Sequence, residues 1–237
     1  MLEGIHKIHL IGIGGSGMRA IANILIQKGY EVSGSDVKES DVIERFRQMG
    51  ATVHIGHNAD YVQGVDAVVR STAIREDNPE IVAAKEQGIT ILHRSDIVKA
   101  VLDVTNGIAV AGAHGKTSTT SMIGQILVEG QMEPTVIIGG EVDYLKGSSC
   151  LGKGEYSVVE ADESDGSFLK LRPKTIVITN IEDDHMDHYK TMENLLNAFC
   201  QFVETLPVDG KAVVCGDNDN IRYVMSKVER QFITYGL

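Results

Sequence analysis

One segment in the middle of the chain has the residues and spacing of a loop that binds nucleotide phosphates. An apolar stretch at 108–111, predicted to be a strand, leads into Gly112-Ala113-His114-Gly115-Lys116-Thr117, and Ser118 to Val128 is predicted to be a helix. The usual G-x-x-x-x-G-K-[ST] pattern begins with glycine at position 110, which is valine here, so the loop is a variant with that glycine at 112. Gly-Lys-Thr at an ordinary helix start is the alternative, which the preceding apolar strand disfavours. We predict that residues 112–118 bind ATP.

Each part of this loop has a chemical task in that prediction. Backbone amides at the helix start can hold the β-phosphate, and the Lys116 ammonium can reach the β- and γ-phosphates. The Thr117 hydroxyl can ligate the Mg²⁺ that accompanies the triphosphate. Lys116 is therefore predicted to be catalytic as well as nucleotide-binding.

Two acidic segments later in the chain could supply further ligands for magnesium. Each follows a predicted strand, and they are Glu160-Ala161-Asp162-Glu163-Ser164-Asp165 and the stretch from Asn180 to His188. Because the carboxyl ends of parallel strands meet at one edge of a sheet, we expect both segments beside the phosphate loop. Either segment alone is more typical of a solvated acidic loop. All three features together favour a metal site, since Mg²⁺ takes oxygen ligands and occasionally imidazole.

A second glycine-rich turn lies near the N-terminus. The predicted strand Lys7 to Ile11 leads into Gly12-Ile13-Gly14-Gly15-Ser16-Gly17 and a predicted helix from Met18 to Gln27, which matches G-x-G-x-x-G. Asp36 follows 19 residues after Gly17, where a ribose-binding carboxylate would lie. Taken alone, the pattern predicts NAD, and a ligand-free packing turn is the alternative. The residues favour a nucleotide diphosphate without naming it.

The elements around these motifs form two series of strands that alternate with helices, which predicts two α/β units with parallel sheets. The first series is predicted at 7–11, 31–35, 52–54, 67–70 and 90–92, and resembles a Rossmann sheet. The second is predicted at 108–111, 135–138, 157–160, 175–179, 212–215 and 231–234. We place the boundary at 103–106 and predict an amphipathic helix at 191–206 that ends before Pro207.

Composition excludes several classes of protein. The 237 residues are 43% hydrophobic and 23% charged, which is typical of a compact globular protein. A net charge of -11 disfavours nucleic-acid binding, which needs clustered Lys and Arg. Three widely spaced cysteines argue against a disulfide framework and a zinc site. No signal peptide or bilayer-spanning run is visible, so we expect a cytoplasmic protein that does not bind membranes.

Three motifs in this order resemble the Mur ligase family. They are the variant phosphate loop, the segment from Glu160 to Asp165, and Thr179-Asn180-Ile181 leading to Asp184-His185-Met186-Asp187. Further stretches resemble the family members that add L-alanine to UDP-N-acetylmuramate, namely Gly12 to Met18, Ser71-Thr72-Ala73-Ile74 with Asn78-Pro79-Glu80, and His93-Arg94. The resemblance covers essentially the whole chain, and the ordered combination is more specific than any single motif.

The resemblance implies an ATP- and Mg²⁺-dependent ligase whose partners are UDP-N-acetylmuramate and L-alanine. Residues 1–104 would form a UDP-sugar-binding domain, and residues 105–237 would form the central ATP-binding domain. The residues implied to line the sugar-nucleotide site are Gly14, Gly15, Ser16, Gly17, Met18, Asp36, Ser71, Thr72, Ala73, Ile74 and Arg94. Those implied for ATP are Gly112, Ala113, His114, Gly115, Lys116, Thr117, Ser118 and Asn180.

The same resemblance implies that Thr117, Glu160 and His185 hold metal and that Lys116, Glu160 and His185 are catalytic. Family chemistry would phosphorylate the lactyl carboxylate of the sugar nucleotide, and the amine of L-alanine would attack the resulting acyl phosphate. Such an intermediate makes physical sense, because a carboxylate is a poor acyl donor until one oxygen becomes a phosphate leaving group.

The chain departs from the family pattern in two respects. Ala113 stands where the family loop usually has threonine, and the sequence ends before the third domain that family members have. We therefore expect a truncated central domain and no turnover by these 237 residues alone. The alternatives are a ligase that attaches a recycled peptide to the same sugar, an NAD-dependent oxidoreductase, and a non-catalytic nucleotide-binding module.

Overall fold

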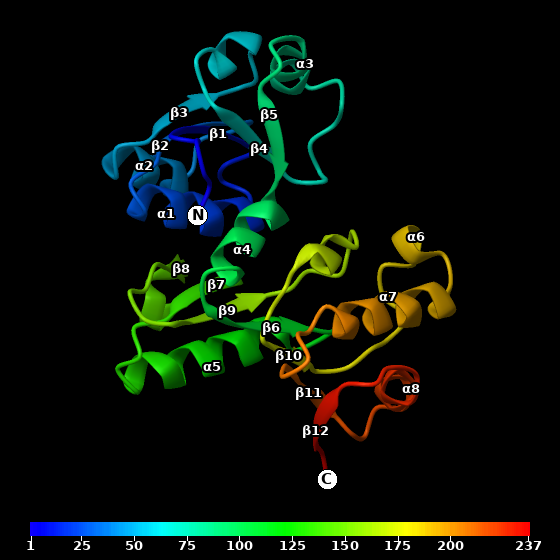
Figure 1. Ribbon diagram of the computed structural model, residues 1–237. Coiled ribbons are helices and arrows are strands. Elements are labelled where there is room, and N and C mark those ends of the chain that lie inside the picture. Colours follow the sequence, from blue (N-terminus) through cyan, green and yellow to red (C-terminus); the bar gives the residue numbers. More distant parts are fainter. The chain divides into compact units, whose positions relative to one another are not determined.

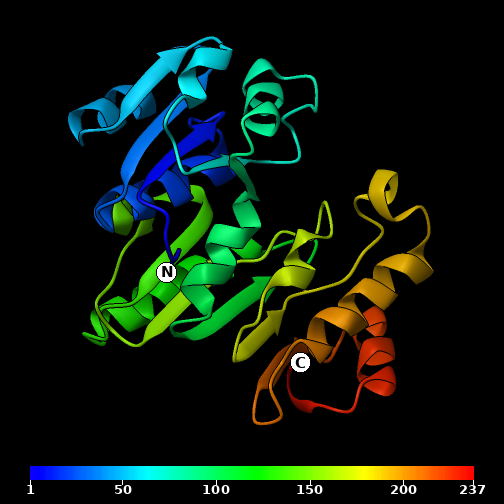
Figure 2. The same ribbon diagram turned by 45° about the horizontal axis from the view of Figure 1, so that its top comes forward.

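The computed structural model describes residues 1–237, which fold into two compact units. The first unit comprises Met1–Ile97 and Gly139–Leu151, and the second comprises Val98–Ile138 and Gly152–Leu237. The sequence predicted a division after residue 104, whereas by packing the first unit ends at Ile97 and takes in a later segment. Figures 1 and 2 show strands and helices alternating along both units. The α/β fold class is confirmed.

The first unit contains a five-stranded parallel sheet. Its strands are β1 (Lys7–Ile11), β2 (Glu31–Asp36), β3 (Thr52–Ile55), β4 (Ala67–Arg70) and β5 (Thr90–His93). They lie in the order β3-β2-β1-β4-β5 and every pair is parallel. The strand order reverses between β1 and β4, and the carboxyl ends at such a switch point are where open α/β sheets bind ligands.

The helices of this unit begin and end as their sequences dictate. They are α1 (Ser16–Gln27), α2 (Asp41–Gln48), the short 3₁₀ helix η1 (Ala59–Val62), α3 (Pro79–Glu86) and α4 (Arg94–Leu102), which continues into the second unit. Ser40 caps α2 by accepting from Ile43 N, and Asn78 caps α3 by accepting from Glu80 N. Pro79 takes the first helical position of α3, where its missing N–H costs nothing.

Apolar side chains fill the space between this sheet and α3. Ile11 of β1, Val68 of β4 and Ile81 of α3 are fully buried in one cluster. Burying each of these side chains contributes about 1.5–3 kcal/mol. The cluster therefore holds α3, and the segment that precedes it, against the carboxyl half of the sheet.

The second sheet of the protein has seven strands. Its strands are β6 (Asn106–Ala111), β7 (Thr135–Val142), β8 (Gly147–Cys150), β9 (Tyr156–Glu160), β10 (Thr175–Ile178), β11 (Lys211–Cys215) and β12 (Gln231–Tyr235). They lie in the order β12-β11-β10-β6-β9-β7-β8. Strands β10 and β9 flank β6 in parallel, so the segments that follow all three strands emerge at one edge.

Strand β8 was not predicted, because Gly-Ser-Ser-Cys has no apolar alternation. It forms because Gly139–Leu151, which also contains the 3₁₀ helix η2 (Asp143–Leu145), packs on α1 in the first unit. Asn23 Nδ2 donates to Ser149 O at 3.0 Å, and Ser149 Oγ donates to Ala20 O at 2.9 Å. Hydrogen bonds to α1 thus hold β8 in place, although its sequence lacks the apolar alternation of a strand.

The second unit also contains α5 (Lys116–Glu129), the 3₁₀ helix η3 (Ser167–Lys170), α6 (Met186–Tyr189), α7 (Met192–Glu204) and α8 (Asp219–Lys227). Helix α5 packs against β6 and β9, and α7 packs with α8 (Figure 1). The predicted amphipathic helix is α7, which Thr191 caps. Its Phe202 lies 4.7 Å from Phe168 of η3 between ring centroids, which anchors the loop after β9.

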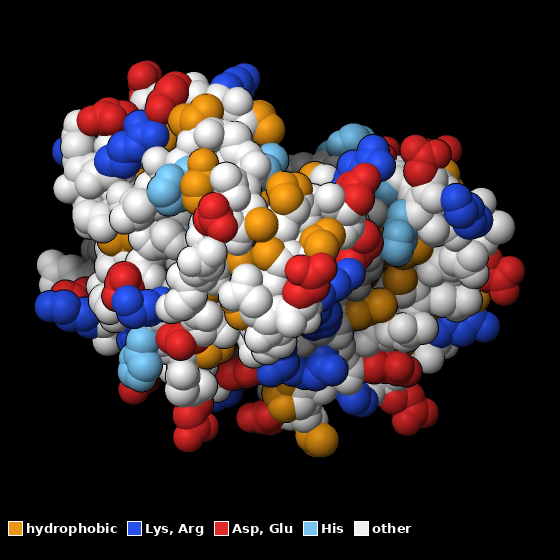
Figure 3. Space-filling model, turned by 90° about the horizontal axis from the view of Figure 1, so that it is seen from above, with side chains coloured by type: hydrophobic (Ala, Val, Ile, Leu, Met, Phe, Trp, Pro, Cys, Tyr) orange, Lys and Arg blue, Asp and Glu red, His pale blue; other side chains and the backbone are white.

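On the face shown in Figure 3, acidic and basic side chains are interspersed, and no broad basic area forms there. No helix combines the length and the apolar composition that crossing a membrane requires.

Candidate active site

The phosphate loop joins β6 to α5 and has a backbone that only glycine can adopt. Gly112 has a φ of +135° and Gly115 a φ of +81°. A Cβ on Gly112 would lie 2.2 Å from Thr179 Oγ1 and 2.8 Å from Asn180 O. Both distances are shorter than real Cβ contacts, so glycine is required at 112 in this variant loop.

Residues at the end of β10 hold the loop in shape. Asn180 Oδ1 accepts from His114 N at 2.9 Å, and its Nδ2 donates to His114 O at 2.9 Å. Thr179 Oγ1 also donates to His114 O, at 2.6 Å. Asn180 was predicted to bind the nucleotide; in the structure its side chain binds the loop, and a direct ligand contact stays a prediction.

Lys116 points its ammonium back into the loop. Its Nζ donates to Gly112 O at 2.5 Å and to Glu163 Oε1 at 2.7 Å, with a longer contact to Ala113 O at 3.3 Å. The three contacts match the three donors of an ammonium group. A phosphate entering the loop would therefore exchange with acceptors that already surround Lys116.

Thr117 and Glu160 meet because their strands are neighbours. Val110 of β6 is in register with Glu160 of β9, so the start of α5 faces the end of β9. Thr117 Oγ1 lies 3.2 and 3.1 Å from the two Glu160 carboxylate oxygens. A hydroxyl and a carboxylate at this spacing are oxygen ligands of the kind that Mg²⁺ prefers.

His185 approaches the same group of side chains from the loop before α6. It has a left-handed backbone with a φ of +57°, which turns the chain into α6. Its Nε2 lies 3.7 Å from Glu163 Oε1 and 3.6 Å from Asp184 Oδ2. The structure thus brings Lys116 and His185 to the same Glu163 oxygen, Oε1, at the edge where Thr117 and Glu160 meet.

Glu163 is the residue that sequence reasoning missed, although it belongs to the acidic segment that we singled out. Its side chain is only 2% exposed, and its Oε2 is buried without a hydrogen-bond partner in the protein. Burial raises the pKa of this carboxyl above its ordinary value, although the hydrogen bond from Lys116 opposes the rise. The sequence could not tell which acid of the segment turns inward.

The site fits a nucleotide-bound magnesium ion better than a metal held by protein alone. No group of three or more His, Cys, Asp and Glu side chains in residues 1–237 forms a metal-binding cluster. Mg²⁺ in nucleotide sites keeps several waters and takes only one or two carboxylates besides phosphate oxygens. The Thr117–Glu160 pair and the unpartnered Glu163 Oε2 match that smaller demand.

The first glycine-rich turn is shaped by the end of β2. Gly12 N and Ile13 N both donate to Ser35 O, at 2.8 and 3.0 Å. Gly14 N donates to Asp36 Oδ2 at 2.8 Å. The predicted ribose-binding carboxylate is therefore also a part of the turn's own framework.

Other residues predicted for this site surround the turn unevenly. A Cβ on Gly17 would lie 2.7 Å from Arg94 Nη1, and one on Gly12 would lie 3.4 Å from Ile74 Cδ1, so Arg94 and Ile74 border the turn. Gly15 caps α1 and Ser16 begins it. The loop at 71–74 closes with a hydrogen bond from Ile74 N to Ser71 O, and Thr72 and Ala73 are exposed. Met18 is 3% exposed, so its side chain belongs to the core.

Comparison with known proteins gives the family. Residues 7–104 match the family model described as Mur ligase family, catalytic domain, and residues 110–237 match the Mur ligase middle domain. The chain belongs to the Mur ligase family. The oxidoreductase alternative is thereby removed, because the two family matches cover both glycine-rich turns.

Among Mur ligases, curated UDP-N-acetylmuramate–L-alanine ligases are close relatives. The chain is 46% identical to the one from Desulfatibacillum aliphaticivorans over 98% of this chain and 51% of that protein. It is 46% identical to the Geobacter sulfurreducens protein over 100% of this chain and 52% of that protein. The chain thus spans about half the length of the curated relatives that it matches.

Solved Mur ligase structures have the same fold. A UDP-N-acetylmuramate–alanine ligase from Thermotoga maritima superimposes with a TM-score of 0.86 at 31% identity, covering 98% of this chain and 52% of that one. A UDP-N-acetylmuramate:L-alanyl-γ-D-glutamyl-meso-diaminopimelate ligase from Neisseria meningitides gives 0.90 at 27% identity, covering 98% and 78%. The backbone fold therefore does not separate these two kinds of Mur ligase.

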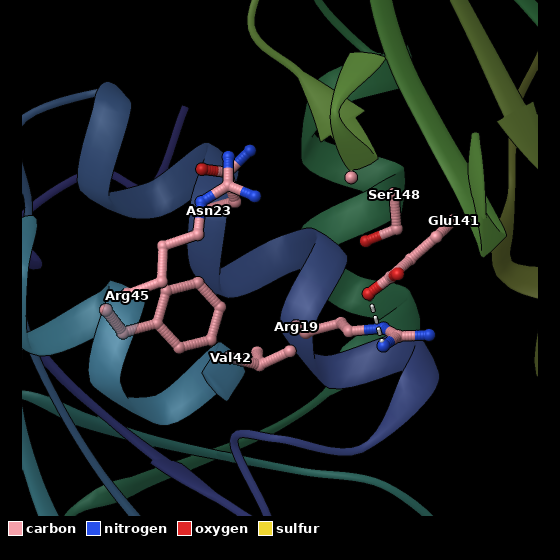
Figure 4. A pocket seen from close by; sticks show the side chains of 8 residues that line it. Arg19, Asn23, Val42, Arg45, Glu141 and Ser148 are labelled. Carbon is pink, nitrogen blue, oxygen red and sulfur yellow. Dashed lines mark hydrogen bonds and ion pairs between the residues drawn. The ribbon is translucent and has the colours of Figure 1, made fainter. Parts of the chain in front are cut away.

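A cavity in the first unit of this Mur ligase lies between α1, α2 and the segment from β7 to β8. Figure 4 shows its lining, which comprises Arg19, Asn23, Val42, Arg45, Phe46, Glu141, Gly147 and Ser148. Arg19 Nη1 donates to Glu141 Oε1 at 2.9 Å across it. Its volume of about 30 Å³ has room for one or two water molecules. It is too small to be the binding site for a sugar nucleotide.

Proposed function

We propose that this chain carries the sugar-nucleotide-binding and ATP-binding parts of a ligase that joins L-alanine to UDP-N-acetylmuramate in peptidoglycan precursor synthesis. The observation that carries the proposal is the meeting of Lys116, Thr117 and Glu160 with Glu163 and His185 at one sheet edge. The names of the curated relatives, at 46% identity, support the substrates.

The proposed chemistry makes a carboxylate reactive. ATP supplies the γ-phosphoryl group, which converts the lactyl carboxylate into an acyl phosphate that the amine of L-alanine attacks with loss of phosphate. Lys116 exchanges its contacts with Gly112 O for phosphate oxygens and offsets their charge. The loop amides from Gly115 onward would orient the triphosphate at the start of α5.

Magnesium fits two positions in this scheme and, when bound, offsets charge on the transferring phosphoryl group. Thr117 Oγ1 and the Glu160 carboxylate would hold the ion that accompanies the triphosphate. His185 Nε2, as neutral imidazole, together with Glu163 would hold a second cation near the acceptor carboxylate. Glu160 and His185 act in this proposal as metal-orienting catalytic residues.

The first glycine-rich turn would hold the diphosphate of the sugar nucleotide. The amides of Ser16, Gly17 and Met18 lie at the start of α1, and a helix start attracts anions. Arg94 lies beside Gly17 and would offset the charge of the diphosphate. Asp36, which accepts from Gly14 N, would lie near the uridine. The loop at 71–74 would border the same ligand.

Three free cysteines are consistent with a reducing, cytoplasmic location.

A second candidate is the recycling ligase that attaches a peptide to the same sugar. The TM-score of 0.90 with the Neisseria meningitides enzyme favours it, although the sequence identity of 27% is lower than with the L-alanine ligases. Both candidates share the sugar nucleotide, ATP and the acyl phosphate. They differ only in the amine that attacks.

Phosphate release tests the proposal. The protein, as its gene encodes it, is mixed with UDP-N-acetylmuramate, ATP and Mg²⁺, and either L-alanine or L-alanyl-γ-D-glutamyl-meso-diaminopimelate. Release that depends on L-alanine supports the first candidate, and release that depends only on the peptide replaces it with the second. If the 237-residue chain binds neither ATP nor the sugar nucleotide in calorimetric titrations, the proposal is wrong.

A further inference from the structure

A polar cluster in the core of the first unit has no part in the chemistry above. Its centre is the carboxylate of Glu80, the last residue of the Asn78-Pro79-Glu80 segment at the start of α3. Glu80, His9 and Ser35 are each 0% exposed. A buried charge is costly unless it is paired and hydrogen-bonded. The hydrogen-bond partners of the Glu80 carboxylate are therefore essential to it.

Each oxygen of Glu80 has two partners, and the partners come from three other elements. Oε2 accepts from Ser35 Oγ of β2 at 2.7 Å and lies 3.2 Å from His9 Nε2 of β1. Oε1 lies 3.1 Å from His57 Nδ1 and accepts from Asn58 N at 3.2 Å, both in the loop after β3. One side chain from α3 therefore joins β1, β2 and the segment after β3.

These partners are close neighbours of the atoms that shape the first glycine-rich turn. Ser35, whose hydroxyl donates to Glu80, uses its carbonyl oxygen to accept from Gly12 N and Ile13 N. The next residue, Asp36, accepts from Gly14 N through its side chain and from Gly56 N through its carbonyl oxygen. A shift of Ser35 would therefore move the turn directly.

We propose that Glu80 is a positioning residue for the sugar-nucleotide site: it fixes the middle of β1, the end of β2 and the loop after β3, and so presets the first glycine-rich turn for a diphosphate. The proposal rests on the proposed function of that turn. Stability alone does not explain a carboxylate here, because well-packed apolar residues often stabilise a core as well as a buried charged group does. A buried acid that satisfies four groups instead fixes their mutual geometry.

The test measures the Kd for UDP-N-acetylmuramate by calorimetry in four variants. Glu80→Ala removes all four contacts, and Ser35→Ala removes only the link to the turn. Glu80→Gln keeps the shape, and Ser35 Oγ and a neutral His9 can both accept from its amide, so it should rescue most of the loss. Ile81→Ala is the control for lost packing, because it creates a cavity on the same helix and leaves every hydrogen bond of Glu80 in place.

We expect the Kd to rise about tenfold or more in Glu80→Ala and several-fold in Ser35→Ala, as for residues within one network. Ile81→Ala should lower the melting temperature and leave the Kd unchanged. The Kd for ATP with Mg²⁺, which reports on the second unit, should be the same in all variants.

Each result decides something. An Ile81→Ala protein whose Kd rises as much as that of Glu80→Ala would make the role of Glu80 merely structural and overturn the inference. If Glu80→Ala does not fold, an unchanged Kd in Ser35→Ala overturns it instead. Wild-type protein that binds no UDP-N-acetylmuramate overturns the proposed function and the inference with it, whereas normal wild-type binding with unaltered variants overturns the inference alone.

Discussion

The two glycine-rich turns have the same strand–turn–helix form and differ in what holds them. The turn at 12–17 is braced by the next strand in sequence, through Ser35 O and Asp36 Oδ2. The loop at 112–115 is braced by Thr179 and Asn180, which lie 65 and 66 residues further along the chain than His114. Both turns follow a strand that has a parallel neighbour on each side, β2 and β4 for β1, and β9 and β10 for β6.

The two turns also differ in the charged side chains beside them, and this supports the different chemistry that we propose for each. The loop at 112–115 is followed at once by Lys116 and Thr117, and the neighbouring strand β9 presents Glu160 and Glu163 to them. The turn at 12–17 has no lysine, and Arg94 lies beside its Gly17. A backbone cradle is enough to bind a diphosphate, whereas transfer of a phosphoryl group needs charges placed by adjoining strands.

The sharpest way to break this comparison is to remove the cation of the second turn. In the protein as its gene encodes it, Lys116→Met should lower L-alanine-dependent phosphate release by about 10²–10³-fold, the usual effect of losing one transition-state donor. Calorimetry should show unchanged UDP-N-acetylmuramate binding, because Lys116 belongs to the second unit. Lys153→Met, at an exposed position, is the control. Equal activity of the two variants would contradict the role of Lys116.

The next test concerns the glycine of the variant loop. Gly112→Ala should abolish measurable ATP binding and destabilise the second unit by about 1–3 kcal/mol, because φ +135° is strained for alanine and the new Cβ meets Thr179. Gly216→Ala is the matched control, since its nearest neighbour would be 3.5 Å away. Titration with ATP and chemical denaturation measure both effects. Wild-type ATP affinity in Gly112→Ala would refute the fit of the loop.

The corresponding change in the first turn should be milder. A Cβ on Gly17 meets the end of the flexible Arg94 side chain, which can move away. Gly17→Ala should therefore change stability by less than about 1 kcal/mol, in the range of ordinary helix-start substitutions. The Kd for UDP-N-acetylmuramate should nevertheless rise, because the guanidinium is displaced. A large loss of stability with normal affinity would reverse this expectation.

The smallest expected effects are on the pH dependence of stability. The contributions of Glu80 in the first unit and Glu163 in the second should change with pH in opposite directions. Burial alone raises the pKa of Glu80, but hydrogen bonds from His9, Ser35 and His57 outweigh it, and the pKa lies below the ordinary value. Glu80 thus contributes stability above the ordinary glutamate pKa that is lost as the pH falls through its lowered pKa. Burial leaves the pKa of Glu163 raised, so ionised Glu163 costs stability, and this cost is relieved as the pH falls.

Thermal denaturation between pH 3 and pH 7 measures both signs. Glu80→Gln should be less stable than wild type at pH 7, by about 1–3 kcal/mol for lost hydrogen bonds to a charge, with a gap that narrows toward acid. Glu163→Gln should gain on wild type as the pH rises above the ordinary glutamate pKa. Parallel pH curves for the two variants would show that the acids do not differ in this way.

Local patterns predicted most of the fold, because strands and helices are marked by short-range periodicity. Strands β1 and β4 have the predicted bounds, and the other predicted strands differ by a few residues at their ends. The apolar spacing from Met192 to Leu206 predicted α7, whose buried face includes Phe199 and Phe202. Strand β8 was missed, since its formation depends on hydrogen bonds from Asn23, more than a hundred residues away.

The candidate site could be predicted only in part. The motifs named Lys116, Thr117, Glu160 and His185, and the structure places all four at one sheet edge. Their catalytic and metal-binding roles stay predictions. Glu163 was not named, because Asp162, Glu163 and Asp165 are equivalent acids in the sequence and only packing decides which one is buried.

The sequence by itself determined the motifs and their order, the two α/β units and the membership of the Mur ligase family. Each motif and each element is a pattern of residues close together along the chain. Tertiary structure alone decided that Glu163 faces Lys116, that Asn180 holds the phosphate loop, and that Glu80 joins β1, β2 and the loop after β3. Those contacts link residues 45 to 66 positions apart. No local pattern encodes them, since strand order and register set which distant side chains meet.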